Sequence, residues 1–240
     1  MTDLAEIATG DASGPLAGRM PRPLPPRTVM EGRWARLEPF SVAAHAAGQH
    51  AAFAEEPGDD LWRFRDEGPF ADEVAYRAFA ARTMTGDDPL YFAILDRAGG
   101  RPLGSAAFMR IVPAHGVIEV GSITYAPRLK RTRVATDAMY LMARRAFDEL
   151  GYRRYEWKCD DRNTPSKRAA ARLGFRFEGV FRQHMVVRGR NRDTAWFAMT
   201  DDEWPARRAA FERWLEPANF DADGRQKARL AEFSGGSRTA

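Results

Sequence analysis

The chain has 240 residues, 44% of them hydrophobic, and a formal net charge of +4. No run of about 18 apolar residues occurs, which excludes a membrane-spanning helix, and the single cysteine excludes an intrachain disulfide. The positive balance fits nucleic acid, an anionic small molecule, or scattered surface arginines that bind neither. The N-terminus lacks the apolar core of a secretory signal, so we expect a cytoplasmic protein.

Three regions differ in composition. Residues 1–30 include Pro21-Arg-Pro-Leu-Pro-Pro26 and offer little apolar surface, which predicts a disordered tail. Residues 31–218 carry the periodic apolar patterns of one folded domain. Residues 219–240 are polar and end in Ser-Gly-Gly-Ser-Arg-Thr-Ala, which predicts a flexible C-terminal tail.

Apolar spacing within the folded region predicts alternating strands and helices. In chain order, the expected elements are a strand at 33–38, helices at 41–53 and 71–84, strands at 90–96, 102–112 and 117–125, a helix at 133–150, a strand at 154–159, a short helix ending at Gly174, strands at 175–187 and 193–199, and a helix from about Asp201. Gly and Pro between the three central strands are typical of hairpins, so these strands should form an antiparallel meander. The strand, helix and strand across 117–160 imply a crossover, hence a locally parallel or split region.

Two helix N-termini follow directly on strands. Tyr125-Ala-Pro127 leads through the basic turn Arg128-Leu-Lys-Arg-Thr-Arg133 into the long helix. The strand ending in Lys158-Cys-Asp160 leads through Asn163-Thr-Pro-Ser166 into the short helix. Unpaired N–H groups and the positive end of a helix dipole favour phosphate at such junctions. The pattern therefore predicts a protein that holds a phosphorylated cofactor, whereas Cys159, within a strand pattern, reads as a buried and unreactive thiol.

These segments resemble the GCN5-related N-acetyltransferases, whose diphosphate turn reads Gln/Arg-x-x-Gly-x-Gly/Ala. Lys130 stands at its first position, Arg133 replaces the first glycine, and Ala135 fits the last. Glu178-Gly-Val-Phe-Arg182 and Arg188-Gly-Arg-Asn-Arg-Asp193 resemble the RimJ/RimL-like branch. The resemblance spans roughly residues 34–204 and implies an α/β (α+β) fold. It implies a mixed, mostly antiparallel sheet of about seven strands, splayed in the middle and flanked by helices.

The resemblance also implies acetyl-coenzyme A as acyl donor. The residues expected to bind it are Ile123, Thr124 and Tyr125 in the strand, Lys130, Arg131, Thr132, Arg133, Val134, Ala135 and Thr136 in the turn, and Asn163 and Ser166 before the short helix. Asn163 either contacts the pantetheine arm or caps the helix, and both roles are compatible. Ser166 either approaches the thiol end or is a first-turn hydroxyl. Thr136 and Asp137 alternatively only support the first helical turn.

The implied reaction is direct attack of a primary amine on the thioester, with a backbone N–H near residues 123–125 stabilising the oxyanion. Glu119 is our candidate base, because it interrupts an apolar strand beside the expected thioester site. Alternatively it pairs with an arginine across the sheet. Many family members carry a Tyr as general acid on the short helix, but Ala170 stands there, which leaves Tyr125 as a weaker candidate.

The acceptor amine should be bound by the irregular segment 55–70, with Trp62, Phe64 and Arg65 as candidate contacts. The same aromatic residues fit a packed flap over the sheet equally well. No spacing of histidine and cysteine suggests a metal. The acceptor is a protein N-terminus or a small amine, longer acyl donors stay open, and a homodimer is possible. A non-catalytic acyl-coenzyme A sensor, or a ribosome- or RNA-associated protein, are the alternative functions.

Overall fold

The computed structural model describes residues 20–55 and 60–234. Its strands are β1 (Met30–Glu31), β2 (Ala35–Pro39), β3 (Leu90–Asp96), β4 (Pro102–Val112), β5 (Val117–Tyr125), β6 (Arg154–Asp160), β7 (Arg176–Val187) and β8 (Arg190–Thr200). Its α-helices are α1 (Val42–Phe53), α2 (Glu73–Thr83), α3 (Arg133–Arg144), α4 (Thr164–Arg172), α5 (Trp204–Trp214) and α6 (Leu230–Phe233). None of the helices in these ranges is long and apolar enough to cross a membrane.

All eight strands belong to one sheet with the order β1-β2-β3-β4-β5-β6-β8-β7. Every neighbouring pair is antiparallel except β5 and β6, which are parallel. The parallel pair arises because α3 carries the chain back from the end of β5 to the start of β6. The expected mixed and mostly antiparallel sheet is therefore confirmed, and the short strand β1 brings the number of strands to eight.

Local signals set the helix boundaries close to the expected ones. The Ser41 hydroxyl accepts the Ala44 N–H (3.4 Å) before α1, and the Asp72 carboxylate accepts the Ala75 N–H (2.8 Å) before α2. These side chains satisfy N–H groups that have no partner inside the helix. The long helix expected over 133–150 is an α-helix only through α3, and then continues as a π-helical turn over Arg145–Glu149.

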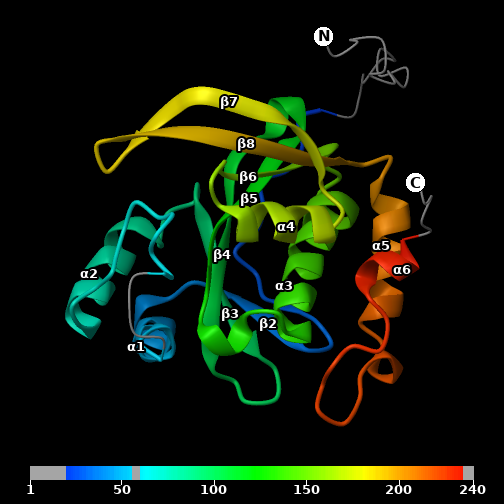
Figure 1. Cartoon of the computed structure of the whole chain (residues 1–240), viewed down its shortest axis with the longest axis horizontal. Coiled ribbons are helices and arrows are strands. Elements are labelled where there is room, and N and C mark those ends of the chain that lie inside the picture. Colours follow the sequence, from blue (N-terminus) through cyan, green and yellow to red (C-terminus); the bar gives the residue numbers. More distant parts are fainter. Residues whose placement is uncertain (1–19, 56–59, 235–240) are drawn as a thin grey trace.

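Helices cover both faces of the sheet, with α3 and α5 on one side and α1 and α2 on the other (Figure 1). On β6, Tyr155 points to the side of α3, where its ring packs 5.8 Å from that of Phe147. Trp157 lies on the same side, because alternate residues of a strand share a face. Glu156 and Lys158 therefore point to the opposite side. We call these two sides the α3 face and the α1–α2 face.

A buried carboxylate joins α3 to the start of β2. Asp137, 1% exposed, accepts the backbone N–H groups of Trp34 (2.6 Å) and Ala35 (2.9 Å). Gly32 leaves room for it, since an added Cβ would lie 2.3 Å from the Asp137 Oδ2 atom. Desolvation raises the pKa of Asp137, and the backbone N–H bonds oppose that rise. Asp137 thus orients the β1–β2 turn, which differs from the expected role of supporting its own helix.

The segment before β1, expected to be part of a disordered tail, packs against the domain. The Arg22 N–H donates to the Pro113 carbonyl (3.0 Å), and the Tyr152 hydroxyl donates to the Pro23 carbonyl (3.1 Å). A proline-rich segment can dock in this way because its extended backbone leaves its carbonyl groups free to accept bonds. Residues 1–19 of the expected tail lie outside the described residues.

Much of the expected C-terminal tail also packs. Phe220, 7% exposed, lies 5.0 Å from the Trp214 ring, and the Trp214 Nε1–H donates to the Gln226 side chain (3.0 Å). Composition did not reveal this order, because the anchoring side chains are separated by polar residues without a regular period. Only residues 235–240 of that tail lie outside the described residues.

Candidate active site

The strands β5 and β6 pair over only three residues and then separate. Residues 117–119 pair with residues 154–156. Beyond them, β5 continues along β4 to Tyr125, while β6 continues along β8 to Asp160. Between the two diverging stretches, the facing backbone groups have no ladder partner among the described residues. A molecule that carries amide groups along an extended arm can pair with them.

A β-bulge bends β5 where it leaves β6. Ala107 pairs with Gly121 and Ser105 pairs with Thr124, so β5 spends an additional residue over this stretch. Ser122 in the bulge has φ of 50°, in the left-handed region. A bulge of this kind increases the local twist and leaves one residue outside the ladder. The bulge therefore directs the end of β5 away from β6.

The bulge also changes which face the later side chains of β5 occupy. Glu119 and Tyr125 are an even number of residues apart, so an unbroken strand would place both on one face. Glu119 pairs with Glu156 and lies on the α1–α2 face. Tyr125 lies on the α3 face, where the charge of Arg172 partly opposes the rise that burial causes in its pKa, and where Tyr125 itself raises the pKa of Tyr155. The two candidates for proton transfer are thus on opposite faces of the sheet.

The turn between β5 and α3 presents free backbone N–H groups. The Thr132 hydroxyl caps α3 by accepting the Ala135 N–H (3.1 Å). Immediately before it, Arg131 has φ of 64°, which turns the chain sharply. The N–H groups of Arg133 and Val134 have no acceptor among the described residues. Two free N–H groups at the positive end of a helix dipole are suited to bind an anion, and we call this turn the candidate anion site.

The arginines of this turn do not all point to that anion site. Arg133 has helical backbone as the first residue of α3, so no glycine is required at its position. Its guanidinium lies 3.7 Å from the ring centroid of Trp34 and 5.4 Å from that of Phe220, which hold it away from the turn. Arg128 pairs with Glu55 of the loop after α1 (2.7 Å). The backbone of Arg133, more than its side chain, is therefore available to an anion.

Three further residues expected in this site are also located. Lys130 and Arg131 are exposed at the turn. Thr136 is buried, and its hydroxyl accepts a hydrogen bond from Nη1 of Arg172 (3.1 Å). The Arg172 guanidinium also lies 5.0 Å from the Trp214 ring, so this contact ties α4 to α3 and α5. Thr136 thus has a packing role whether or not it also meets a ligand.

Asn163 caps α4, which is one of the two roles expected for it. Its Oδ1 accepts the Ser166 N–H (3.1 Å), and its side-chain NH₂ donates to no described residue. Ser166 accepts a bond from the indole N–H of Trp157 (3.0 Å), which fixes that ring beside the separated strands. Burial raises the pKa of the Cys159 thiol, as expected for an unreactive cysteine. Asn163 therefore keeps a donor for a ligand, and Ser166 has a structural contact.

Glu119 forms the ion pair that was one alternative for it. The side chain is 2% exposed, and Arg110 donates from Nε to Oε2 (2.7 Å) and from Nη2 to Oε1 (3.4 Å). Arg110 itself has φ of 46° in a bulge of β4, where the Asp88 carboxylate accepts the N–H groups of Arg110 (2.9 Å) and Ile111 (3.0 Å). Asp88 thereby positions the arginine that holds Glu119.

The protonation of the two candidates favours Glu119 as the group that accepts a proton. Desolvation raises the pKa of Glu119, although the bonds from Arg110 oppose the rise. A carboxylate with a raised pKa is a stronger base than a solvated one. Burial raises the pKa of Tyr125 well above its ordinary value. A phenol that holds its proton so firmly is a poor acid toward a thiolate.

The segment expected to contact the acceptor is partly a packed flap. Trp62 is 8% exposed, and its ring lies 5.7 Å from Phe53 and 5.1 Å from Phe70. Gly68 permits this packing, since an added Cβ would lie 2.4 Å from the Trp62 ring. Trp62 therefore supports the loop from inside.

Arg65 in the same loop reaches the separated strands. Its Nη1 donates to the Ile123 carbonyl (3.5 Å), directly after the bulge of β5, and its Nη2 lies 3.4 Å from the Glu67 carboxylate. Phe64 is half-buried beside the Arg63 guanidinium (5.5 Å). Of the three candidates, Arg65 is the one joined to the strand where the chemistry is expected.

The hairpin of β7 and β8 contacts the loop that contains Arg65, a feature the sequence patterns did not suggest. The strands form a long arm that extends toward the side of α2 (Figure 1). At its tip, the Arg188 guanidinium donates to the carbonyls of Glu67 (3.1 Å) and Gly68 (2.6 Å). The turn sequence is visible in the chain, but its partners lie 121 and 120 residues earlier. Only the fold brings the hairpin and the loop together.

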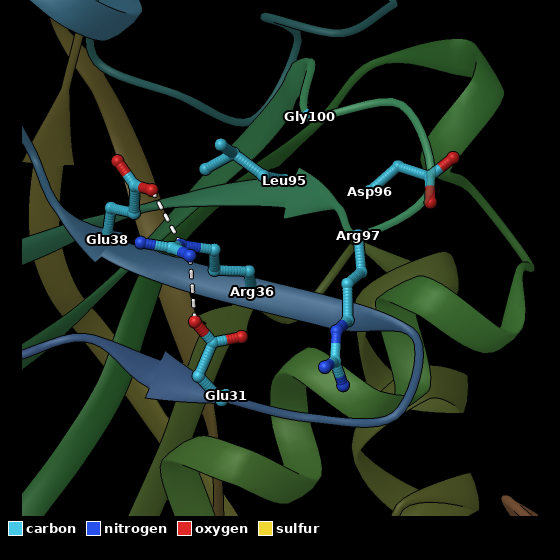
Figure 2. A pocket seen from close by; sticks show the side chains of 7 residues that line it. All are labelled: Glu31, Arg36, Glu38, Leu95, Asp96, Arg97 and Gly100. Atoms are coloured by element: carbon cyan, nitrogen blue, oxygen red, sulfur yellow. Dashed lines mark ion pairs between the residues drawn. The ribbon is translucent and has the colours of Figure 1, made fainter.

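Other parts of the described chain offer no competing site of comparable chemistry. No group of three His, Cys, Asp or Glu side chains in the described residues is placed to hold a metal. A hollow of about 430 Å³ lies at the opposite edge of the sheet, beside β2 and β3 (Figure 2). Arg36 spans it by pairing with Glu31 (2.9 Å) and Glu38 (2.7 Å), so its charges are already matched.

Comparison with known proteins agrees with this geometry. The family described as acetyltransferase (GNAT) domain matches residues 35–176. A GCN5-related N-acetyltransferase from Brucella melitensis is 49% identical, with a TM-score of 0.87 over 90% of this chain and 97% of that one. A probable GNAT-family acetyltransferase from Chromobacterium violaceum is 40% identical, with a TM-score of 0.76 over 82% of this chain and 98% of that one. RimJ from Mycobacterium smegmatis, solved in complex with CoA-disulfide, shares the fold at 20% identity, with a TM-score of 0.60 over 75% and 90% of the two chains. The chain belongs to the GCN5-related N-acetyltransferase (GNAT) family.

Proposed function

We propose that this protein transfers an acetyl group from acetyl-coenzyme A to a primary amine. The observation that carries the proposal is the separation of β5 from β6 directly before the free N–H groups of α3. Unpaired strand backbone followed by an anion site suits a molecule in which an amide-containing arm joins a thioester to a diphosphate. GNAT enzymes as a family use this donor.

The chain offers matching partners for each part of the donor. The backbone of residues 123–125 would pair with the amides of the arm, and the free NH₂ of Asn163 would add a donor to them. The N–H groups of Arg133 and Val134 would hold the diphosphate, with the exposed guanidinium of Arg131 adding charge. Acetyl-coenzyme A, when bound, supplies an activated thioester.

Glu119 would remove a proton from the protonated amine, directly or through a water molecule, so that the nitrogen can attack the thioester carbonyl. The new C–N bond forms, the C–S bond breaks, and one of the two protons left on the nitrogen passes to the departing thiolate, so that the products are the amide and the thiol. The bulge after Gly121 leaves backbone outside the ladder near the carbonyl oxygen, where an N–H can stabilise negative charge. Arg110 holds Glu119 in place and keeps it ionised until the amine arrives.

Calorimetric titration of acetyl-coenzyme A tests the donor site. We expect micromolar binding to the wild type, and a loss of at least about tenfold in an Arg131→Ala, Asn163→Ala double variant, because one charge-assisted and one neutral hydrogen bond are removed. Arg101→Ala, an exposed arginine in the turn between β3 and β4, is the matched control and should bind normally. Failure of the wild type to bind would overturn the proposal.

A non-catalytic acyl-coenzyme A sensor is the second candidate, and one observation favours it. Glu119 is already paired with Arg110, and Tyr125 holds its proton firmly, so both candidate proton-transfer groups have a structural explanation. A sensor would bind the donor with the same affinity but release no coenzyme A with any amine. An enzyme should lose its rate in Glu119→Gln while it keeps its affinity for the donor.

A further inference from the structure

Charged residues of β6 and β8 gather on the α1–α2 face, next to the point where β5 and β6 separate. Lys158 pairs with Trp196 in the β6–β8 register, and Asp160 pairs with Thr194. Arg192 precedes Thr194 by two residues on β8, so the alternation of side chains along the strand places it on this face as well. Glu119 belongs to the same face through its register with β6. The cluster therefore lies beside the candidate base.

The carboxylates on this part of the sheet already have arginine partners. Glu119 pairs with Arg110 (2.7 Å). Glu156 pairs with Arg154 (2.5 Å), which also binds Glu178. Asp160, at the end of β6, pairs through both oxygens with its neighbour Arg162 (3.0 and 2.8 Å). Arg154 is shared by two carboxylates, so these four carboxylates and three arginines carry one net negative charge, which can balance only one further cation.

Lys158 and Arg192 are two further positive charges, so the group as a whole has a surplus of one positive charge. Neither forms an ion pair with a described residue. The ammonium of Lys158 lies 5.0 Å from the ring centroid of Trp196. Burial lowers the pKa of Lys158 to about 8. The charges of Arg110 and Arg192 add to this decrease, and those of Glu119 and Glu156 oppose it. Lys158 is therefore still mostly charged at pH 7. Two cations without ion-pair partners, in a group with a net positive charge on a partly buried surface, favour an anionic ligand.

Two buried N–H donors of β8 lie in the same place without partners. The Nε–H of Arg192 and the Nε1–H of Trp196 are buried and donate to no described residue. Buried donors of this kind are rare in folded proteins, because an unmade hydrogen bond costs about 1–3 kcal/mol. A group rich in acceptor oxygens would therefore satisfy both donors and both cations.

Two further rings of the hairpin lie on one side of these donors. The rings of Phe181 and His184 lie 5.1 and 5.9 Å from the Trp196 ring. Desolvation and the nearby cations Lys158 and Arg192 hold the pKa of His184 below its usual value, so His184 is neutral at pH 7 and adds no charge.

We propose that the acceptor amine carries a carboxylate, and that Lys158 and Arg192 bind this carboxylate while the amine meets Glu119. Both are specificity-determining residues, and the inference rests on the proposed acetyl transfer. Glu119 lies opposite Glu156, and Lys158 is two residues further along the same face of β6, so the carboxylate and the amine of the acceptor should be separated by only a few bonds. The acceptor is thus an amino acid, or a peptide whose acidic residue stands next to its N-terminus.

The test measures coenzyme A release from the full-length protein with matched acceptors. The panel contains free amino acids, each paired with its carboxamide, and short peptides with Asp, Glu, Asn or Gln after the first residue. The best acceptors should carry the carboxylate, with kcat/KM at least about tenfold above the matched amide. The lower basicity of an amino amide makes it intrinsically easier to deprotonate, so this bias runs against the proposal.

Variants locate the effect. Lys158→Met and Arg192→Gln should each lower kcat/KM for the carboxylate acceptor by about 10- to 100-fold, mainly through KM, and leave the amide within about threefold. Arg192→Lys keeps a charge and should restore part of the loss. Arg101→Gln removes one positive charge from the distant β3–β4 turn and should leave all acceptors unchanged. Normal thermal unfolding of each variant shows that it has folded.

The outcomes separate this inference from the proposed function. Preference for the free acid or for the acidic peptide supports the inference and identifies which source supplies the carboxylate. Equal rates for acids and amides, or equal losses for both acceptors in Lys158→Met, overturn it while acetyl transfer stands. Donor binding without turnover of any carboxylate-bearing acceptor overturns it as well. If calorimetry detects no acetyl-coenzyme A binding, the proposed function itself has failed.

Discussion

Replacing Glu119 by Gln removes the candidate base while preserving the shape of the site. The Gln carbonyl can still accept the bond that Arg110 Nε donates at 2.7 Å, and only the weaker contact at 3.4 Å is lost. Positioned general bases contribute about 10²- to 10⁴-fold, so kcat should fall by that factor once an acceptor is known. Affinity for acetyl-coenzyme A should not change, because Glu119 lies on the α1–α2 face, away from the anion site.

The same substitution should cost little stability. Arg110 is 43% exposed, so water can replace the lost contact, and the desolvation that raises the pKa of Glu119 no longer applies. We expect a change in the free energy of unfolding within about 1 kcal/mol, or about 2–4 °C in Tm for a protein of this size. Glu178→Gln is the matched control, since Glu178 forms a similar paired contact with Arg154 on an exposed part of the hairpin.

The pH profile supplies the decisive measurement. Because the pKa of Glu119 is raised, the wild type should lose kcat/KM on the acid side at a pH above the ordinary range of a carboxyl group. The variant should lack this acid limb. By linkage, the raised pKa also means that stability declines as pH rises through it, and the variant should lack that decline. A variant within about threefold of wild-type kcat, with the acid limb intact, would refute the assignment.

Three further outcomes are expected. Asp137→Ala should lower the free energy of unfolding by about 2–4 kcal/mol in a denaturant titration, because two buried N–H groups of the β1–β2 turn lose their acceptor. Asp137→Asn keeps an acceptor oxygen and should cost less. Equal costs for the two variants would contradict this reason. Lys158→Met should abolish a gain in wild-type stability as pH rises from about 8 to 10.4, since a lowered pKa penalises the charged lysine below that window; a flat wild-type curve would contradict it. Arg131→Gly should stabilise the fold by about 1 kcal/mol relative to Arg131→Ala, because glycine adopts the left-handed φ of 64° without strain. Both variants should bind acetyl-coenzyme A equally weakly, since both lack the guanidinium. Higher affinity of the Gly variant would show that the backbone conformation, and not the lost charge, determines donor binding.

Elements with strong local signals followed from the sequence. The bounds of β3, β4 and β5 agree with the alternation and the turn residues that predicted them. Ser41 and Thr132 begin helices because each side chain satisfies a backbone N–H a few residues later in the chain. The strand, turn and helix order of residues 117–160 also sufficed to identify the family, since it determines where a helix N-terminus meets a strand end.

Other features depended on contacts that no local pattern encodes. The bulge at Ser122 places Tyr125 and Glu119 on opposite faces, although their spacing alone puts them together. Trp62, an expected acceptor contact, packs inside its loop because Phe53 and Phe70 lie beside it in the fold. An aromatic residue in an irregular segment reads the same whether its ring is buried or open to a ligand.

The sequence by itself therefore determined the family and the order of the elements, and it predicted the strand, turn and helix that we propose bind a diphosphate, because all of these depend on residues close together in the chain. Only the tertiary structure decided how the charges are paired. Glu119 pairs with Arg110 across two strands, Arg188 in the hairpin turn binds the loop at Glu67, and Lys158 lies over the Trp196 ring without an ion pair among the described residues. The charge balance at a site depends on all charged groups that lie near it in space, and the order of residues along the chain does not determine which groups those are.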